Sequence, residues 1–252
     1  MKVRVLGCYG GELPGYRTTC FLVNNNVMID AGAATAALPL KDQVKIDAIL
    51  LTHSHLDHVR DLGFLADNVF GKREGPVRVW ALPETIRSVK AHILNNTIWP
   101  DFTQLPDAEH PVMSFHELRE GIPVEVEGLA VTAIKVNHLV PAAGYIVKNQ
   151  TAGFAFSGDT GPTEALWKAA AAVDALRAVF LELSLPDRLA ELAELTRHLT
   201  PASALKELIK LNRPDLPVYF FHMKPQYLKE IVNEVDSDPR FHVTEQGDHI
   251  EI

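Results

Sequence analysis

The sequence predicts a layered αββα sandwich, in which two central sheets are covered by helices on both outer faces. Short apolar runs typical of buried strands cluster early in the chain, and segments with helical spacing of apolar residues lie between the later runs. The chain has 252 residues, of which 47% are hydrophobic, and no low-complexity segment interrupts it. A chain of this length can bury a large core, so we expect one domain over residues 1–252.

The expected strands begin with a small meander near the N-terminus. Residues 19–23 and 27–30 flank a turn of three asparagines at 24–26, which favours a tight connection. Residues 46–52 are almost wholly apolar, as expected of a buried strand. Further strands are expected at residues 3–6, 77–82, 124–127, 129–136, 145–148, 153–156, 178–181 and 218–221.

Helices are expected between several of these strands. Residues 83–96 carry apolar side chains at helical spacing, and Pro83 suits a first helical turn. Thr200 and Pro201 are typical of the N-cap and first residue of a helix. Residues 83–117 are expected to form an insertion that covers the substrate. Further helices are expected at residues 163–172, 188–196, 202–211 and 226–235.

The composition restricts the partners and the compartment. The formal net charge is −8, from 24 basic and 32 acidic residues, and no segment is rich in lysine and arginine. This weighs against a nucleic-acid polymer as partner, because such binding needs a basic surface. No apolar run approaches the roughly 18 residues of a membrane span, and no signal peptide is recognisable. Cys8 and Cys20 make no disulfide framework, so a cytoplasmic location is expected.

A dense cluster of metal-binding residue types follows the apolar run 46–52. Four such residues lie within six positions: His53, His55, Asp57 and His58. Residues two apart on an extended backbone share a face, so His53 and His55 can converge on one cation. The chain can then turn and direct Asp57 and His58 at a second cation. The alternative is a polar surface loop, which the density of the cluster makes the weaker interpretation.

Three more candidate ligands follow later apolar runs. His138, Asp159 and His222 each come just after an expected strand. Sites in layered α/β proteins gather at the carboxyl ends of strands, so we expect these residues to join the cluster. Asp159 suits a bridging position, because one carboxylate can neutralise two cations. A lone histidine after a strand is usually a surface residue, but three such coincidences are harder to explain in that way.

This pattern resembles the metallo-β-lactamase superfamily, whose hallmark is H-x-H-x-D-H followed by a distant His, Asp and His. The resemblance covers nearly the whole chain and implies two divalent metal ions, with zinc expected and manganese or iron also compatible. The ligands implied for the first ion are His53, His55 and His138, and those for the second are Asp57, His58 and His222, with Asp159 bridging. The flavodi-iron oxidoreductases of the superfamily have Glu at the second motif position. His55 at that position implies hydrolysis rather than oxygen chemistry.

Other segments resemble one branch of that superfamily, the class II 3′,5′-cyclic-nucleotide phosphodiesterases. The longest is residues 91–102, with the sequence Ala-His-Ile-Leu-Asn-Asn-Thr-Ile-Trp-Pro-Asp-Phe. Residues 10–11, 197–201 and 221–225 resemble the same family. The eukaryotic members are longer, with insertions that this chain lacks. The resemblance implies hydrolysis of cyclic AMP, and often cyclic GMP, to the 5′-nucleotide.

The chemistry of a phosphodiester agrees with this implication. Two cations about 3.5–4 Å apart can bind a phosphate and activate a bridging hydroxide. The leaving 3′-oxygen needs a proton, and His198 is a candidate general acid. Glu182 could hold His198, since a Glu–His pair lies in this region of the superfamily's phosphodiesterases. Asp57 is also a candidate base. A surface histidine and a salt-bridging carboxylate are the alternatives for His198 and Glu182.

Substrate contacts are expected from the helix at 83–96 and the segment after it. His92, Asn95 and Asn96 could reach the ribose or the base. Trp99 could supply an apolar wall for a purine, because ligand pockets usually contain one. Ordinary core packing is the alternative for Trp99.

Several other residues are weaker candidates around the site. Asp30 and Asp47 could hydrogen-bond the ligating histidines, although carboxylates with a structural role at strand ends are equally common. Cys8 lies in a glycine-rich loop and could face the site, but a small buried hydrophobe is the favoured interpretation. Ile98 and Trp99 form an apolar pair that makes a homodimer plausible.

Three other functions are compatible with the metal ligands. A tRNA 3′-processing nuclease shares them, but it needs a basic arm that docks tRNA, and the sequence has no such basic segment. A lactonase or glyoxalase-like thioester hydrolase also shares them, and the resemblance at residues 95–102 argues against it. The third is a non-catalytic nucleotide sensor. Inert relatives usually lose a ligand, whereas this chain retains all seven candidates.

Overall fold

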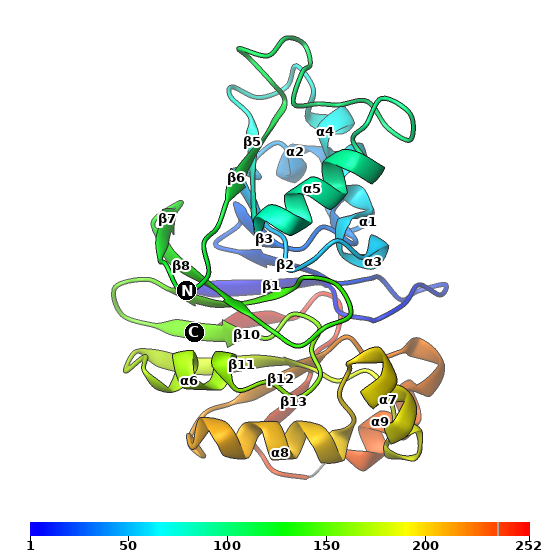
Figure 1. Ribbon diagram of the computed structural model, residues 1–252, viewed down its shortest axis with the longest axis vertical. Coiled ribbons are helices and arrows are strands. Elements are labelled where there is room, and N and C mark those ends of the chain that lie inside the picture. Colours follow the sequence, from blue (N-terminus) through cyan, green and yellow to red (C-terminus); the bar gives the residue numbers. More distant parts are fainter. Residues whose placement is uncertain (236) are drawn as a thin grey trace.

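The computed structural model describes residues 1–235 and 237–252. Two seven-stranded sheets lie face to face at the centre of the molecule, and helices cover the outer face of each (Figure 1). This is the αββα sandwich that the sequence predicts, and each layer combines residues far apart in the chain.

The first sheet has the strand order β14-β1-β2-β3-β4-β5-β6. Its strands are β1 (Lys2–Gly7), β2 (Cys20–Val23), β3 (Val27–Ile29), β4 (Ala48–Leu50), β5 (Val77–Ala81), β6 (Met113–Glu117) and β14 (His249–Glu251). The asparagine turn joins β2 to β3, with φ of 49° at Asn24 and 67° at Asn25, values that asparagine tolerates better than most residues. Strands β3 to β6 are parallel, so their carboxyl ends meet at one edge.

The second sheet has the strand order β13-β12-β11-β10-β9-β8-β7. Its strands are β7 (Val124–Val126), β8 (Leu129–Lys135), β9 (Ala143–Lys148), β10 (Gly153–Phe156), β11 (Leu176–Glu182), β12 (Val218–Phe221) and β13 (Phe241–Val243). Strands β7 to β10 pair antiparallel, and β10 to β13 pair parallel. The carboxyl ends of β10, β11 and β12 therefore also share an edge.

The helices form the two outer layers. Those on the first sheet are α1 (Ala34–Ala37), α2 (Leu40–Gln43), α3 (Leu56–Val59), α4 (Asp61–Val69) and α5 (Pro83–His92). Those on the second sheet are α6 (Ala165–Ala171), α7 (Ala190–Thr196), α8 (Pro201–Leu211) and α9 (Leu228–Glu234), with short 3₁₀ turns at η1 (Asp187–Leu189) and η2 (Pro225–Tyr227). Each helical layer buries its own apolar cluster against its sheet.

Aromatic rings join the two sheets in the central layer. Phe21 of the first sheet contacts Phe156 and Phe221 of the second, with ring centroids 5.2 Å and 5.4 Å away. Phe156 and Phe221 stack on each other at 4.6 Å. All three side chains are fully buried, and each fully buried Phe contributes roughly 1.5–3 kcal/mol relative to an exposed one. This packing fixes the position of one sheet against the other. It therefore also fixes the relative positions of the strand ends that carry the candidate ligands.

Several elements differ from those expected. The helix expected at 83–96 ends at His92, because the Asn95 side chain caps the turn that follows. The helix expected at 188–196 is a 3₁₀ turn followed by α7. Strand β6 was not expected, although Met113 and Phe115 alternate with polar residues, and it pairs with β5. Residues 113–117 therefore belong to the sheet, and the covering role of the preceding segment stays a prediction.

Other features of the chain agree with expectation. Thr200 caps α8 in a capping box with Ser203, and Pro201 is the first helical residue. Cys8 and Cys20 are both free and buried. Among the described helices, none has the length and apolar character that a membrane crossing needs.

Candidate metal centre

The seven candidate ligands lie together where strands of both sheets end. His53 and His55 follow β4, whereas His138, Asp159 and His222 follow β8, β10 and β12. Asp57 and His58 lie in α3. Three groups have ligand atoms within 4.8 Å of one another. The first is His53, His55, His138 and Asp159, the second is Asp57, His58 and His222, and a third, overlapping one is Asp159, His198 and His222. The structure thus brings together every residue that the sequence singles out as a ligand.

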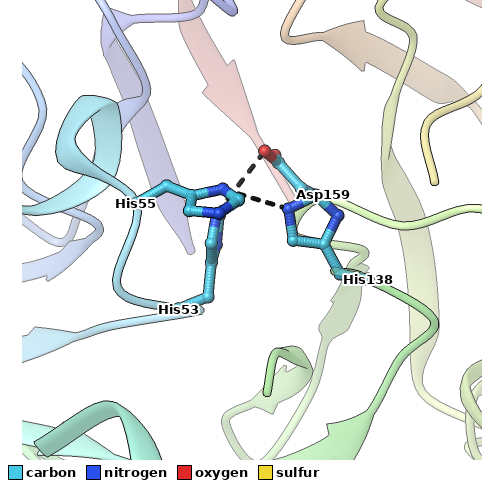
Figure 2. A group of neighbouring side chains, drawn as sticks. All are labelled: His53, His55, His138 and Asp159. Carbon is cyan, nitrogen blue, oxygen red and sulfur yellow. Dashed lines mark hydrogen bonds and ion pairs between the residues drawn. The ribbon is translucent and has the colours of Figure 1, made fainter. Parts of the chain in front are cut away.

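The first group has spacings suited to a single cation (Figure 2). His138 Nε2 lies 3.1 Å from His55 Nδ1, and His53 Nε2 lies 3.7 Å from Asp159 Oδ2. Ligand atoms held tetrahedrally around zinc at about 2.0–2.2 Å lie about 3.3–3.6 Å apart. The separations in this group are close to those values.

Asp159 lies between the first and second groups. Its Oδ2 is 3.7 Å from His53 Nε2, 3.2 Å from His58 Nε2 and 3.0 Å from His222 Nε2. Asp57 Oδ2 completes the second group, at 3.8 Å from His58 Nε2 and 3.9 Å from His222 Nε2. One oxygen of Asp159 therefore faces ligand atoms of both groups, which is the position that a bridging carboxylate requires.

Unpaired buried polar atoms indicate that this cluster is built to hold cations. His53 Nε2, His58 Nε2 and Asp159 Oδ1 are buried and have no hydrogen-bond partner among the described residues. Leaving such an atom unpaired costs about 1–3 kcal/mol. Imidazole nitrogens and carboxylate oxygens are the ligands that zinc, manganese and iron accept. The residues present therefore fit a pair of divalent metal ions.

Asp30 contacts one candidate ligand directly and a second one through Thr52, in agreement with the expectation from the sequence. Its buried carboxylate lies 2.7 Å from His58 Nδ1 and accepts a hydrogen bond from the Thr52 N–H at 2.8 Å. Thr52 Oγ1 in turn lies 3.0 Å from His53 Nδ1. These contacts orient both rings so that Nε2 faces the site. The matching expectation for Asp47 is wrong, because its carboxylate lies in a surface ion pair.

His222 is held in an unusual backbone conformation. Its φ of 70° lies in the left-handed region, which residues other than glycine adopt mainly where the surroundings enforce it. Its N–H donates to the Cys8 carbonyl at 2.6 Å, and Thr19 Oγ1 lies 2.9 Å from its Nδ1. A Cβ on Gly10 would lie 2.4 Å from the His222 carbonyl oxygen. Glycine at position 10 is therefore needed for this close approach.

Burial and neighbouring charges set the protonation of the ligands. Burial lowers the pKa of His53 well below its usual value and that of His138 to about 4. Both imidazoles are therefore neutral, which is the form that binds a cation. Burial alone would raise the pKa of Asp159, but His222 and His58 outweigh it and hold that pKa well below its usual value. The carboxylate between the groups is therefore ionised.

His198 and Glu182 form a pair at the edge of the cluster. Glu182 Oε1 lies 2.8 Å from His198 Nδ1, and the Ser184 hydroxyl donates to Glu182 Oε2 at 3.0 Å. Glu182 is fully buried, whereas the His198 side chain is 11% exposed, beside the His138 ring. Burial alone would lower the pKa of His198, but the Glu182 carboxylate reverses this effect and raises it. Because His198 contacts Glu182 through Nδ1, its Nε2 is available to contact a bound substrate.

The four candidate substrate residues lie at the end of α5 and just after it. Asn95 accepts hydrogen bonds from two backbone N–H groups of the next turn, at 3.0 Å and 2.8 Å, and Asn96 accepts one at 2.9 Å. His92 is exposed, and the Trp99 ring packs edge-on against Phe64 with centroids 5.0 Å apart. None of the four belongs to the ligand groups among the described residues. Their contact with a substrate stays a prediction.

Arg197 has a place in the site that sequence reasoning missed. Its guanidinium donates to the His138 carbonyl oxygen at 2.6 Å, and its own carbonyl oxygen lies 3.3 Å from His138 Nδ1. Arg197 therefore holds one ligand at two points and sets the position of the adjacent His198. The available signal was its place next to His198. Thr19 offered no signal, because 203 positions separate it from the ligand that it contacts.

Two cavities flank the ligand cluster. The larger, of about 510 Å³, lies next to His198, between α7 and Asn137. The smaller, of about 380 Å³, lies next to Asp57, with Arg60 and Lys224 in its wall. Small molecules usually bind in cavities of about 300–1,000 Å³. Both sides of the cluster therefore have room for parts of a substrate.

Two central sheets, helices on both outer faces and a histidine–aspartate cluster at one edge define a metal-dependent hydrolase of the metallo-β-lactamase fold. Residues 25–223 match the family model described as the Beta-lactamase superfamily domain. The chain belongs to this superfamily, which confirms the resemblance seen in the sequence.

Two curated relatives have the names of different enzymes. Ribonuclease Z of Mycobacterium sp. (strain KMS) is 29% identical over 162 residues, which are 59% of this chain and 57% of the relative. The chain thus spans a little over half the length of that relative. The 3′,5′-cyclic-nucleotide phosphodiesterase 1 of Saccharomyces cerevisiae (strain ATCC 204508 / S288c) is 35% identical over 54 residues, which are 21% of this chain and 15% of the relative.

A solved structure shares the fold over almost the whole chain. The crystal structure of unliganded yeast PDE1 aligns with a TM-score of 0.82 and 19% sequence identity, and the alignment covers 98% of each chain. At this level of identity the similarity establishes the fold, and the substrate has to be argued from the site.

Proposed function

We propose that the protein is a binuclear metal-dependent phosphodiesterase that hydrolyses a 3′,5′-cyclic nucleotide, cyclic AMP or cyclic GMP, to the 5′-nucleotide. The observation that carries this proposal is the pair of His198 and Glu182, joined at 2.8 Å beside the ligand cluster. Hydrolysis of a phosphodiester expels an alkoxide, which needs a proton, and a histidine paired with a buried carboxylate suits that task. The same pair has no equivalent task in a site that only binds a nucleotide.

Each of the chain's own residues at the site has a separate role in the proposed reaction. When bound, two divalent cations supply positive charge for the phosphate and lower the pKa of water enough to make it a nucleophile at neutral pH. His198 Nε2 gives a proton to the 3′-oxygen as the bond from phosphorus to that oxygen breaks. Glu182 keeps the proton of His198 Nδ1 in place and stabilises the charged imidazole. Asp57 is a ligand of the second group and a candidate base for the proton that water releases.

Three observations favour a small cyclic nucleotide over other phosphodiesters. Over 54 residues the chain is 35% identical to the yeast 3′,5′-cyclic-nucleotide phosphodiesterase 1. The net charge of −8 offers little attraction to a nucleic-acid polymer. The cavities beside the cluster, of about 510 Å³ and 380 Å³, have the size of small-molecule sites. Zinc is the metal we propose, because three histidines and one carboxylate in the first group suit it.

A tRNA 3′-processing nuclease is the second candidate function. The 29% identity with ribonuclease Z over 59% of the chain favours it. It would use the same metal ligands and the same proton donor, so the site geometry is common to both candidates. The acidic balance of the chain is the observation against it.

The test is a hydrolysis panel with metal analysis on the same preparation. The substrates are cyclic AMP, cyclic GMP, bis(p-nitrophenyl) phosphate, a precursor tRNA, a lactone and a thioester. We expect turnover of a cyclic nucleotide and of the activated phosphodiester, with close to two metal ions per chain. Cleavage of precursor tRNA without turnover of cyclic nucleotides would establish the second candidate. Stoichiometric cyclic AMP binding without turnover in metal-loaded protein would establish a sensor.

A further inference from the structure

We propose that the nucleoside of the substrate binds in the cavity next to His198, hereafter the α7 cavity, and not against the segment after α5. The α7 cavity has a volume of about 510 Å³. It is lined by Asn137, Pro162, Ala190, Ala193, Glu194, Arg197, His198, Thr200 and Ser203. This inference rests on the proposed function, and it assigns the base and ribose of that substrate to one side of the ligand cluster.

The position of the proton donor decides on which side the nucleoside lies. In a 3′,5′-cyclic nucleotide the leaving oxygen stays attached to the ribose, so the group that protonates it must contact that ribose. A general acid works at about 2.6–3.2 Å from the atom that it protonates. His198 is held through Nδ1 by Glu182, so its Nε2 is the donor, and His198 lines the α7 cavity. A ribose within reach of His198 therefore directs its base into this cavity.

The polar groups of the α7 cavity suit a neutral nucleoside. Arg197 uses one guanidinium nitrogen for the His138 carbonyl, which leaves its other N–H groups and its planar face available. The Glu194 side chain is exposed and makes no hydrogen bond or ion pair among the residues that the structure describes. A carboxylate accepts hydrogen bonds from ribose hydroxyls or base amino groups, and a guanidinium can stack on a base. The charges of Glu194 and Arg197 balance each other, and the Glu182 carboxylate behind His198 balances the charge of that ring.

The segment after α5 and the cavity next to Asp57 are less suited to a nucleoside. The Asn95 side chain accepts two backbone hydrogen bonds and donates one to the Ala91 carbonyl oxygen, and the Asn96 side-chain oxygen accepts another, so part of their hydrogen-bonding capacity is used within the turn. The cavity next to Asp57 has Arg60, Lys224, Glu12 and Asp57 in its wall, and Arg60 is paired with Glu12. The Lys224 cation there suits a phosphate oxygen better than an uncharged base. The proposal therefore replaces the base contacts that the sequence predicts.

The test is a substitution at an exposed position that fills the α7 cavity with a large side chain. Ala190 is exposed at the start of α7 and lines the cavity, so Ala190→Trp adds a large ring there without disturbing the core. We expect kcat/KM for cyclic AMP, divided by kcat/KM for bis(p-nitrophenyl) phosphate, to fall by at least about tenfold, mainly through KM. The second substrate has no nucleoside, so the ratio cancels any general effect on metal loading. The matched control is Ala171→Trp on α6, which is exposed and outside the cavity, and its ratio should equal that of the parent.

The outcomes separate this inference from the proposed function. A parent that hydrolyses bis(p-nitrophenyl) phosphate but no cyclic nucleotide would contradict the proposed function. A parent that hydrolyses cyclic AMP, with the same ratio in Ala190→Trp, would contradict the α7 cavity alone. Glu12→Trp fills the cavity next to Asp57 from an exposed position. A fall of the ratio in Glu12→Trp and not in Ala190→Trp would place the nucleoside on that opposite side.

Discussion

Asp57 differs from the other ligands of its group in exposure. Its side chain is 28% exposed, whereas those of His58 and His222 are 0% and 1% exposed. It carries the negative charge of the second group apart from the shared Asp159. Asp57 is thus the ligand whose loss should affect the second cation with the least damage to the fold.

The first prediction concerns Asp57→Ala. We expect bound metal to fall from two ions per chain toward one, and cyclic AMP turnover to fall to background, because the second cation loses its charged ligand. Metal analysis and steady-state kinetics on the same sample measure both effects. Asp42→Ala, at a surface aspartate paired with Lys45, is the control and should match the parent. Two bound ions and a parental kcat in Asp57→Ala would contradict the ligand assignment.

The second prediction concerns His198→Ala. A proton donor that is removed without loss of the cations should lower kcat by about 10²–10⁴-fold and leave the metal content unchanged. The control is His110→Ala, at a histidine whose side chain is 79% exposed. A parental rate with cyclic AMP in His198→Ala would show that another group protonates the leaving oxygen. Loss of metal in this variant would instead show that His198 helps to hold a cation, together with Asp159 and His222.

At the scale of secondary structure, the site depends on how α7 ends. Arg197 terminates this helix with φ 54° and ψ 53°, in the left-handed region. For an L-residue with a Cβ this conformation costs about 1–2 kcal/mol, which glycine avoids. The end of α7 turns the chain so that Arg197 contacts His138 and the next residue, His198, faces the cluster.

The third prediction separates backbone strain from the side-chain contact at this position. Arg197→Ala loses the hydrogen bond to the His138 carbonyl and keeps the cost of the positive φ. Arg197→Gly loses the same hydrogen bond and removes that cost. We expect Arg197→Gly to be more stable than Arg197→Ala by about 1 kcal/mol, measured by denaturant unfolding. Equal stabilities would mean that residue 197 is free to leave the left-handed region.

At the scale of the whole molecule, the cation site joins the two sheets. His53 and His55 follow a strand of the first sheet, and His138, Asp159 and His222 follow strands of the second. A cation that binds ligands from both sheets stabilises the native state alone, because the unfolded chain does not assemble the site.

The fourth prediction is that metal removal lowers the thermal stability. At a free metal concentration of about 100 times Kd, binding raises the free energy of unfolding by about 2.7 kcal/mol. For a chain of this size, that change corresponds to an increase in Tm of roughly 5–10 °C. We therefore expect a fall of that order with a chelator and recovery when zinc is restored, followed by calorimetry. Asp159→Ala lacks the ligand shared by both groups and should show a much smaller chelator effect. An unchanged Tm in chelated parent protein would contradict a cation at this site.

The layers and the ligands could be predicted from the sequence for one physical reason. A strand buried on both faces must be apolar, so β4, β10 and β12 are visible as apolar runs, and the polar residue after each run is visible by contrast. Shorter or more polar elements were missed. Helices α1 to α4 have at most nine residues, and β6 alternates over only five.

The sequence by itself determined which side chains can hold the cations, because their residue types are chemically distinctive and each follows a recognisable strand. Only the tertiary structure decided what orients them. Thr19 reaches His222 across 203 positions, and Arg197 reaches His138 across 59. It also decided that a cavity of about 510 Å³ adjoins His198. Such contacts depend on how two sheets and a helix end pack together, and no local periodicity of the chain encodes that packing.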